Sequence, residues 1–440
     1  MSILTFKKGV HPPHRKHLTE HKPIEYLLPK QILVYPMIQH IGAPCEPIVK
    51  KGDRVLLGQK IGEAKGFVSA PIHSSVSGTV KDVAPVLHPN GSKILSVIVE
   101  NDGLYEKAEG MEKREDYKNL SKDELIKIIQ EAGIVGMGGA GFPTHVKLSP
   151  PPDKKIDSII VNAAECEPFL TSDHRVLLEE TQRVVDGLKI VLHMFPEAKG
   201  YIGIEDNKMD AVEAVKKVVK DEKNIEVKVL KTKYPQGAEK QLIYAITKRE
   251  VPSGKLPADV GCIVQNVETM VAIERAVLRG RPLMRRIVTV TGGAITEPKN
   301  LNVRLGMSFR ELIEACGGFK KEPAKIIAGG PMMGIAVFSI DIPVVKGTSA
   351  ILCLTEEEAA IPEESNCIRC GKCVEACPMN LLPAALNSFA LRNDLEQFEK
   401  LHGMDCIECG SCSFVCPAKR HLVQSFRTAK RTVIANRKKS

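Results

Sequence analysis

The sequence contains no tryptophan, and aromatic residues make up only 4% of its 440 residues. This scarcity argues against the aromatic platforms on which single-stranded nucleic acids stack. An unbroken apolar run of about 20 residues, the length that a membrane-spanning helix needs, is also missing. The longest candidate, residues 326–345, is interrupted by glycine, proline and aspartate, so it predicts short buried strands around a glycine-rich turn. We expect no membrane span and, since residues 1–8 lack an apolar core, no export signal.

Acidic residues are absent from the last 22 positions, where eight basic residues lie: Lys419, Arg420, Arg427, Lys430, Arg431, Arg437, Lys438 and Lys439. The whole chain carries a formal charge of +9, so nearly all of the excess is in this tail. A nearly neutral body argues against a nucleic-acid-binding surface. Apolar residues such as Phe426 and Val433 interleave with the basic ones. This pattern fits either a solvated charged face or a helix that docks on an acidic partner or an anionic membrane.

The length predicts about two to four domains, and hydrophobic and charged contents of 43% and 26% are those of a globular protein. Residues 1–115 alternate short apolar runs with glycine turns, which resembles the flattened barrel of biotinyl and lipoyl carrier domains without the modified hairpin tip. Residues 116–284 alternate strand-like and helical segments, which predicts a Rossmann-like α/β domain. Residues 285–350 predict a β-grasp module. Residues 351–425 carry cysteine motifs on helical sequence, and residues 426–440 complete the basic tail. The fold class is therefore multidomain α/β.

Eight of the 13 cysteines form two runs of the pattern C-x2-C-x2-C-x3-C-P. In two-cluster ferredoxins, three thiolates of a run hold one 4Fe-4S cluster and the fourth ligates the other cluster. The spacing therefore assigns one cluster to Cys367, Cys370, Cys373 and Cys416, and a second cluster to Cys406, Cys409, Cys412 and Cys377. Structural zinc is the alternative, but zinc does not need two complete runs with trailing prolines. The helical pattern of residues 379–405 favours an α-helical ferredoxin domain.

A glycine-rich loop follows the helix that the Ser121–Glu124 capping-box spacing predicts. Its glycines are Gly136, Gly138, Gly139 and Gly141. Such density lets consecutive backbone N–H groups point at an anion, typically a phosphate. A tight turn without a ligand is the alternative.

Four segments in order, residues 136–147, 162–168, 234–239 and 265–269, resemble the FMN- and NADH-binding subunit of respiratory complex I. Over essentially its full length the chain is still more similar to the RnfC family, the C component of the Rnf complexes, which are bacterial membrane-associated ferredoxin:NAD oxidoreductases. The opening Phe6-Lys-Lys-Gly-Val-His-Pro12 and the order of the domains carry this resemblance.

The resemblance implies a binding site for FMN and NAD(H). The FMN phosphate and ribityl chain would lie against Gly136, Gly138, Gly139, Gly141 and Lys147. The flavin would be lined by Asn162, Glu165, Tyr234, Gly237, Gln265, Asn266 and Thr269, and the nicotinamide nucleotide would face Phe142 and Glu167. The sequence departs from complex I at Ala164, Ala238 and Gln265, where the complex I protein has an acid, a glutamate and an asparagine.

The function that the resemblance implies is electron transfer between NAD(H), FMN and two 4Fe-4S clusters, in a complex that couples ferredoxin:NAD(H) chemistry to ion translocation. NADH gives up two electrons as a hydride, whereas iron–sulfur clusters accept one electron at a time, and a flavin can do both. Because the cofactors carry this chemistry, we expect no set of catalytic acid–base residues. We expect a peripheral subunit on the cytoplasmic face of the membrane. Its partners would be the other subunits, NAD(H), and ferredoxin through another subunit. The alternatives are a soluble NADH-dependent diaphorase or hydrogenase subunit, and a docking scaffold whose clusters are structural.

Overall fold

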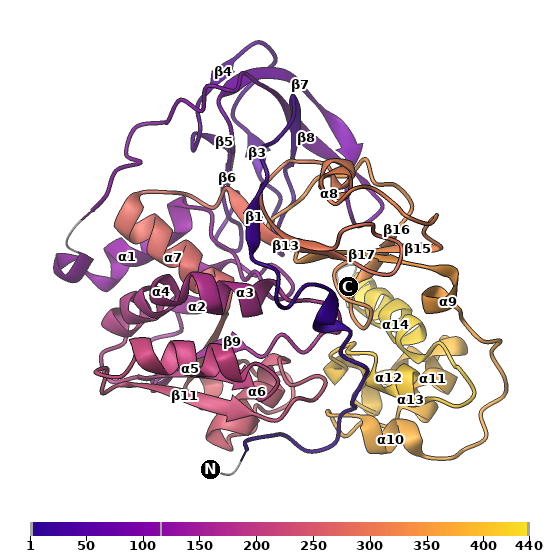
Figure 1. Ribbon diagram of the computed structural model, residues 1–440. Coiled ribbons are helices and arrows are strands. Elements are labelled where there is room, and N and C mark those ends of the chain that lie inside the picture. The colour runs from indigo at the N-terminus through magenta and orange to yellow at the C-terminus, as the bar shows by residue number, and fades with distance from the viewer. Residues whose placement is uncertain (1–2, 115–116, 438–440) are drawn as a thin grey trace.

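The computed structural model describes residues 3–114 and 117–437 (Figure 1). The described residues form one six-stranded sheet, two four-stranded sheets and one three-stranded sheet, followed by a helical region. The multidomain α/β architecture predicted from the sequence is therefore confirmed. The domain boundaries stay predictions. The boundary at 115/116, together with Lys438 and Lys439 of the basic tail, lies outside the described residues.

Two antiparallel sheets form the barrel at the top of Figure 1. One has the order β2–β8–β7–β4, with bounds Ile32–Pro36, Lys93–Asn101, Gly78–Leu87 and Arg54–Val55. The other has the order β3–β5–β6, with bounds Glu46–Pro47, Lys60–Glu63 and Ile72–His73. Alternate residues of β2 and β8, such as Leu33, Tyr35, Val97 and Val99, are fully buried. This period of two explains why the short apolar runs predict strands.

The second region is an open, all-parallel sheet of order β11–β10–β9–β12. Its strands are Ile225–Leu230, Lys199–Glu205, Ser158–Ala163 and Cys262–Asn266. The helices are α1 Lys122–Glu131, α2 Thr144–Leu148, α3 Ser172–Glu179, α4 Thr181–Met194, α5 Met209–Val218, α6 Glu239–Thr247 and α7 Val267–Arg279, with η2 Tyr117–Asn119 and η3 Pro257–Val260. Ile159 packs in the core that contains α4 and α7, whereas Ile160 packs with α6. Helices thus cover both faces of the sheet, as buried parallel strands require.

The third region is the mixed sheet β1–β14–β13–β17–β15–β16 with one helix, α8 Phe309–Ala315. Its strands are Ile24–Tyr26, Lys299–Arg304, Arg285–Thr291, Ala350–Leu354, Lys325–Ala328 and Ile335–Val337. The helix α9 Glu356–Ala359 follows it. β1 pairs in parallel with β14, so the first strand of the chain joins this sheet rather than those of the barrel.

The helical region consists of α10 Lys372–Ala376, α11 Pro383–Leu391, α12 Leu395–Lys400, η4 Gly403–Asp405, α13 Ser411–Val415 and α14 Leu422–Arg437. α14 contains most of the basic tail, whose first basic residues, Lys419 and Arg420, precede it. Of the apolar residues of α14, Phe426 and Val433 are buried, whereas Ile434 is 46% exposed. Its basic residues Arg427 and Lys430 both pair with Glu408. Part of the interleaved pattern of the tail thus reflects packing within the chain. No helix of the described residues is long and apolar enough to cross a membrane.

Residues 3–23, which we call the amino-terminal strap, run between the parallel-sheet region and the helical region before they reach β1 (Figure 1). The strap includes η1 Lys16–Leu18. Leu4 bridges to Leu230 of β11, and Val10 bridges to Tyr234. The backbone N–H of Gly9 donates to the carbonyl oxygen of Ala376 in α10, at 3.2 Å. The strap therefore joins two regions that are far apart in sequence.

The packing of α4 on α7 generates a stability prediction. A Cβ at Gly187 would overlap the backbone carbonyl oxygen of Met270, which cannot move without shifting α7. Overpacking of this kind costs about 1–3 kcal/mol, which exceeds the few tenths that valine gains over glycine in helix propensity. We expect Gly187→Val to lower the melting temperature measured by calorimetry. Gly347→Val is the matched control, because a Cβ at Gly347 has no neighbour within 4 Å; equal melting temperatures of the two variants would contradict the prediction.

Candidate functional site

The site is centred on the carboxyl ends of two neighbouring parallel strands. From β9 the chain continues to β10 on one side, and it later returns as β12 on the other side. Asn162 of β9 and Asn266 of β12 are register partners at these ends. In open α/β sheets, ligands bind outside the carboxyl ends of the strands at the point where the strand order reverses. The topology therefore places the candidate site beside these two asparagines.

The glycine-rich loop lies next to this point, between α1 and α2. The N–H of Gly136 donates to the carbonyl oxygen of Phe142 at 2.8 Å, which closes the loop. The N–H of Met137 donates to the hydroxyl of Thr269 at 3.1 Å, which fastens the loop to α7. Residues 138–140 are exposed. The structure thus brings the loop next to Thr269, another residue of the site that the resemblance implies.

Two adjacent glycines of this loop have different surroundings. A Cβ at Gly138 would lie 2.6 Å from Nδ2 of Asn266, so the protein itself requires glycine there. A Cβ at Gly139 would have no heavy atom within 4 Å. The backbone beside Gly139 is therefore accessible to a ligand.

Asn266 is held by the protein on both sides of its amide group. Its Nδ2 donates to Oδ2 of Asp173 at 2.6 Å, and its Oδ1 accepts from the N–H of Glu268 at the start of α7. Burial, together with the neighbouring charges of Glu165 and Glu268, raises the pKa of Asp173 to about 7. Asp173 was not among the residues expected at the site, because a single acid at the start of a helix has no distinctive pattern.

Lys147 and Gly237 are positioned by contacts across the same strand ends. The ammonium of Lys147 lies 2.7 Å from Oε1 of Glu239 and 3.2 Å from the carbonyl oxygen of Val264. Nδ2 of Asn162 donates to the carbonyl oxygen of Gly237 at 2.8 Å. Lys147, in the helix that follows the glycine-rich loop, is thus held by the carboxylate of Glu239. Glu239 comes directly after Ala238, one of the positions at which the sequence differs from the complex I protein.

Two buried glutamines provide a test of whether a polar ligand fits here. Gln265, only 1% exposed, has no hydrogen-bond partner for either side-chain amide atom among the described residues, and neither has the fully buried Gln236. A buried amide without a partner costs about 1–3 kcal/mol, so such groups call for a ligand or ordered water. Gln265 directly precedes Asn266 in β12, and Gln236 precedes Gly237. These orphaned amides and the open space at Gly139 fit a phosphate-bearing polar cofactor such as FMN.

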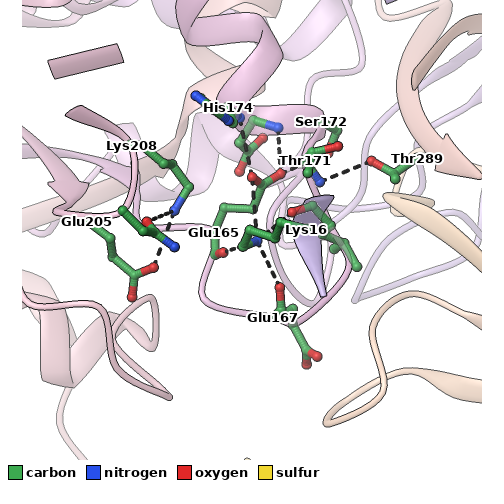
Figure 2. A network of polar contacts seen from close by, with 12 residues as sticks. Lys16, Glu165, Glu167, Thr171, Ser172, His174, Glu205, Lys208 and Thr289 are labelled. Carbon is green, nitrogen blue, oxygen red and sulfur yellow. Dashed lines mark hydrogen bonds and ion pairs between the residues drawn. The ribbon is translucent and has the colours of Figure 1, made fainter. Parts of the chain in front are cut away.

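The segment 165–170 beyond β9 is organised by buried lysines (Figure 2). The ammonium of Lys16 donates to the carbonyl oxygens of Glu165 at 2.9 Å and Glu167 at 3.0 Å, and also to that of Leu170. Lys208 donates to the carbonyl oxygen of Ala164 at 2.8 Å. Burial lowers the pKa of Lys16, whereas the Glu165 carboxylate opposes that shift. No sequence pattern points to Lys16, because its contacts lie about 150 positions away.

Glu165 and Glu167 both use their carboxylates within the protein. Glu165, whose side chain is 3% exposed, accepts from the N–H of Asp173 at 2.7 Å and so caps the start of α3. Glu167 accepts from the N–H groups of Met332 at 3.0 Å and Met333 at 2.8 Å. Burial raises the pKa of Glu167 to about 7. The structure thus places these two expected ligands as anchors of the loop, with their carboxylates already hydrogen-bonded.

Four of the motif cysteines surround a single cavity in the helical region. Its lining includes Cys377, Cys406, Cys409 and Cys412, together with apolar residues such as Leu381 and Phe426. Burial raises the pKa of the Cys406 thiol to about 11, and the nearby Cys409 and Cys377 act in the same direction. This is the set that the spacing assigns to one cluster, including the fourth ligand from the other run.

The other set is more open. Cys367 and Cys370 are exposed, Cys373 and Cys416 are partly buried, and Cys416 contributes to the raised pKa of Cys373. No group of three or more His, Cys, Asp or Glu side chains in residues 3–114 and 117–437 is placed to hold a single metal ion. Four soft thiolates around one cavity are the donor set of an iron–sulfur cluster, which spreads its ligands over several metal atoms. The cysteine assignments stay predictions.

Tyr234 connects the strand-end site with the cysteine cavity. Its buried hydroxyl donates to the carbonyl oxygen of Cys409 at 2.7 Å. Its ring packs in an apolar cluster that also contains Val10 of the strap, Ala376 and Cys166. Tyr234 was expected to line the flavin; its contact with the cysteine run could not be read from the sequence, since 175 positions separate the two residues.

Comparison with protein-family models matches four consecutive parts of the chain. Residues 4–104 match the RnfC barrel sandwich hybrid domain, and residues 129–275 match the Nuo51 FMN-binding domain. Residues 287–336 match the SLBB domain, and residues 366–420 match a 4Fe-4S dicluster domain.

Two curated relatives are similar over nearly the full length. The C component of the Na⁺-translocating ferredoxin:NAD⁺ oxidoreductase complex of Acetobacterium woodii is 52% identical over 435 residues, which cover 99% of this chain and 98% of the relative. The C component of the proton-translocating ferredoxin:NAD⁺ oxidoreductase complex of Clostridium ljungdahlii is 52% identical over 431 residues, which cover 97% and 94%. Among solved structures, a chain of NAD⁺-reducing [NiFe]-hydrogenase in the H2-reduced state has a similar fold. It has a TM-score of 0.50 and 17% identity, and the match covers 73% of this chain and 62% of that chain.

The surroundings of Gly139 generate a clean test of the cofactor site. Because no protein atom opposes a side chain there, Gly139→Val should leave the melting temperature of the flavin-free protein unchanged. It should nevertheless abolish FMN binding, because the branched side chain occupies the space beside the loop N–H groups. Flavin released by denaturation, measured by fluorescence, checks the loss. Gly138→Val is the informative contrast, since it should disturb Asn266 and lower stability as well; full flavin content in Gly139→Val would place the site elsewhere.

Proposed function

Because the chain belongs to the RnfC family, the C component of ion-translocating ferredoxin:NAD⁺ oxidoreductase complexes, we propose that it transfers electrons between NAD(H) and one-electron carriers within such a complex. In this role it is an NAD(H)-dependent oxidoreductase subunit with FMN and two 4Fe-4S clusters. The observation that carries the proposal is the contact of Tyr234 with Cys409, which joins the strand-end site directly to a cavity lined by four cysteines.

Different residues of the strand-end site would bind different parts of FMN. The loop N–H groups around Gly139 would face the phosphate, with Lys147 held nearby by Glu239. The unpartnered amides of Gln236 and Gln265 would hydrogen-bond the polar edge of the flavin. FMN supplies the conversion between a two-electron hydride and single electrons. Phe142 would face the nicotinamide nucleotide. Glu167, also expected to face it, holds the turn at Met332 and Met333.

The two cysteine sets would have different places in the electron path. The set around the cavity includes Cys409, which touches Tyr234, so this set lies on the flavin side. Cys367 and Cys370 are exposed, which suits electron exchange with a partner protein. The partners would be the other subunits of the complex, with ferredoxin reached through one of them, at the cytoplasmic face of the membrane. The names of the two relatives state different ions, Na⁺ and H⁺, so the proposal extends to translocation but not to one ion.

We also propose a specific fold for each of the three regions that contain sheets. The all-parallel sheet covered on both faces supports a Rossmann-like flavin domain. The mixed sheet around α8 supports a β-grasp module, and the paired antiparallel sheets support a biotinyl-like barrel.

The cluster assignment is tested by metal content in single and double variants. Anaerobically purified protein should contain about eight iron and about eight sulfide per chain, and Cys377→Ala should retain about four of each. The double variant Cys377→Ala/Cys406→Ala should also retain about four, because both residues hold one cluster. Cys377→Ala/Cys373→Ala should lose nearly all, because each change removes a ligand of a different cluster. The buried, isolated Cys353→Ala is the control. The reverse result for the two double variants would mean that each run holds its own cluster, and zinc without sulfide would exclude both arrangements.

Electron entry is tested with the flavin-free variant. When NADH is added anaerobically to the wild-type protein, the visible bands of the clusters should bleach after, or together with, the flavin band. In Gly139→Val, NADH should leave the clusters oxidised, whereas dithionite should reduce them and so prove that they are intact. Reduction of the clusters by NADH in the absence of flavin would overturn the proposed order.

A further inference from the structure

An exposed aromatic ring of the barrel lies beside the glycine-rich loop of the flavin domain. Phe67 is in the hairpin tip between β5 and β6, and its side chain is 60% exposed. The other strongly exposed aromatic residues among those described are Tyr26 in β1, Phe338 beside β16, and Phe414 in α13. A single exposed aromatic residue is ordinary on a protein surface, so the surroundings of Phe67 must decide whether it has a role.

The tip that carries Phe67 is fixed against the flavin domain. Nε2 of His145 lies 2.9 Å from the carbonyl oxygen of Phe67. The N–H of Ala43 donates to the carbonyl oxygen of Val68 at 2.9 Å. Gly42, at φ 118°, allows this approach, since a Cβ there would overlap the same carbonyl group. Both anchors act on backbone atoms, so the position of the tip does not depend on the phenyl ring.

At least one face of the Phe67 phenyl ring is not covered by its aromatic contact with His145. The rings of Phe67 and His145 meet edge-on, with centroids 5.7 Å apart and an interplanar angle of 87°. A T-shaped contact covers at most one face of the phenyl ring, and the large exposure of Phe67 shows that much of the ring meets solvent. A rigid, solvent-exposed aromatic face is a stacking surface for a planar group.

This stacking surface adjoins the site where the dinucleotide would lie. His145 is in α2, which begins directly after the glycine-rich loop. The N–H of Ile41 in the barrel donates to the carbonyl oxygen of Gly141 at 3.3 Å, so two barrel segments border the end of the loop. Residues 138–140 of the loop are exposed towards solvent. In the proposed function the loop holds the FMN phosphate, and Phe142, which follows Gly141, faces the nicotinamide nucleotide. The adenosine half of NAD(H) would then extend from Phe142 past the exposed loop residues.

We propose that Phe67 of the barrel domain is the stacking platform for the adenine ring of NAD(H). The inference rests on the proposed function and adds to it a nucleotide-binding residue from outside the flavin domain. It gives the barrel a part in substrate recognition. Stacking of a base on an aromatic side chain contributes about 1–3 kcal/mol, and adenine is held through its face rather than through a hydrogen-bonding pattern.

The test compares two hydride donors on the FMN-loaded full chain: NADH and reduced nicotinamide mononucleotide, which lacks the adenylate half. In Phe67→Ala, kcat/KM for NADH with an artificial acceptor should fall by about tenfold through KM, which corresponds to about 1.4 kcal/mol. kcat/KM for the mononucleotide should be unchanged. The dissociation constant of NAD⁺, measured by titration calorimetry, should rise by the same factor. Phe67→Tyr should restore both NADH values, because it keeps the ring, and Phe338→Ala should behave as the wild type.

Three results would overturn the inference. They are unchanged NADH kinetics and NAD⁺ affinity in Phe67→Ala, an equal loss with both donors, and loss of FMN from the variant, since the last two would mean a structural role. Failure of the proposed function gives a different result, because the wild-type protein would then oxidise neither donor.

Discussion

The buried ammonium of Lys16 is the interaction on which the arrangement of the site depends. An unpaired buried cation would cost several kcal/mol, but three backbone carbonyl groups and the nearby carboxylate of Glu165 satisfy this one. Those carbonyl groups belong to the segment 165–170. In the same segment, the carboxylate of Glu165 caps α3, and the carboxylate of Glu167 accepts a hydrogen bond from the turn at Met332 in the six-stranded sheet. A residue of the amino-terminal strap therefore sets the shape of a loop in the flavin domain, and the neighbouring regions are placed against that loop.

The regions converge because small and polar residues allow backbones to approach closely. Gly330 lets the Met332 turn reach the carboxylate of Glu167, and Gly410 lets the second cysteine run pack on the same turn. Tyr234 then fills the space between this turn and the cysteine cavity with a ring whose only polar atom is hydrogen-bonded. The result is a closely packed contact between the strand-end site and the cysteines. In the proposed function, such packing would fix the separation of the flavin and the nearer cluster without a covalent link.

The sequence was most informative where structure is determined locally. The Ser121–Glu124 spacing predicts a capping box, and the structure has a reciprocal one at the start of α1. The cysteine spacing also predicts that Cys377 shares a cluster with the second run. Cys377 lines one cavity with three cysteines of that run, and the ligand set itself stays a prediction. In contrast, the pairing of Lys147 with Glu239 and the burial of Lys16 depend on how separate regions pack. The expectation that Glu165 and Glu167 face the cofactors came from resemblance, which identifies a motif but does not show which atoms its side chains contact.

The amino-terminal strap also has a consequence for the order in which the molecule can be completed during synthesis. Lys8 donates to the carbonyl oxygen of Val374, 366 positions later, and the strap leads into β1, which pairs with β14. Chains emerge from the ribosome amino terminus first, at about 5–20 residues per second. The first segment to emerge must therefore wait on the order of tens of seconds for its last partners. The contacts of the strap with α10 can therefore form only after residues 372–376 have emerged, late in synthesis. A segment made at the start of synthesis thus completes its contacts only when the second half of the chain is present.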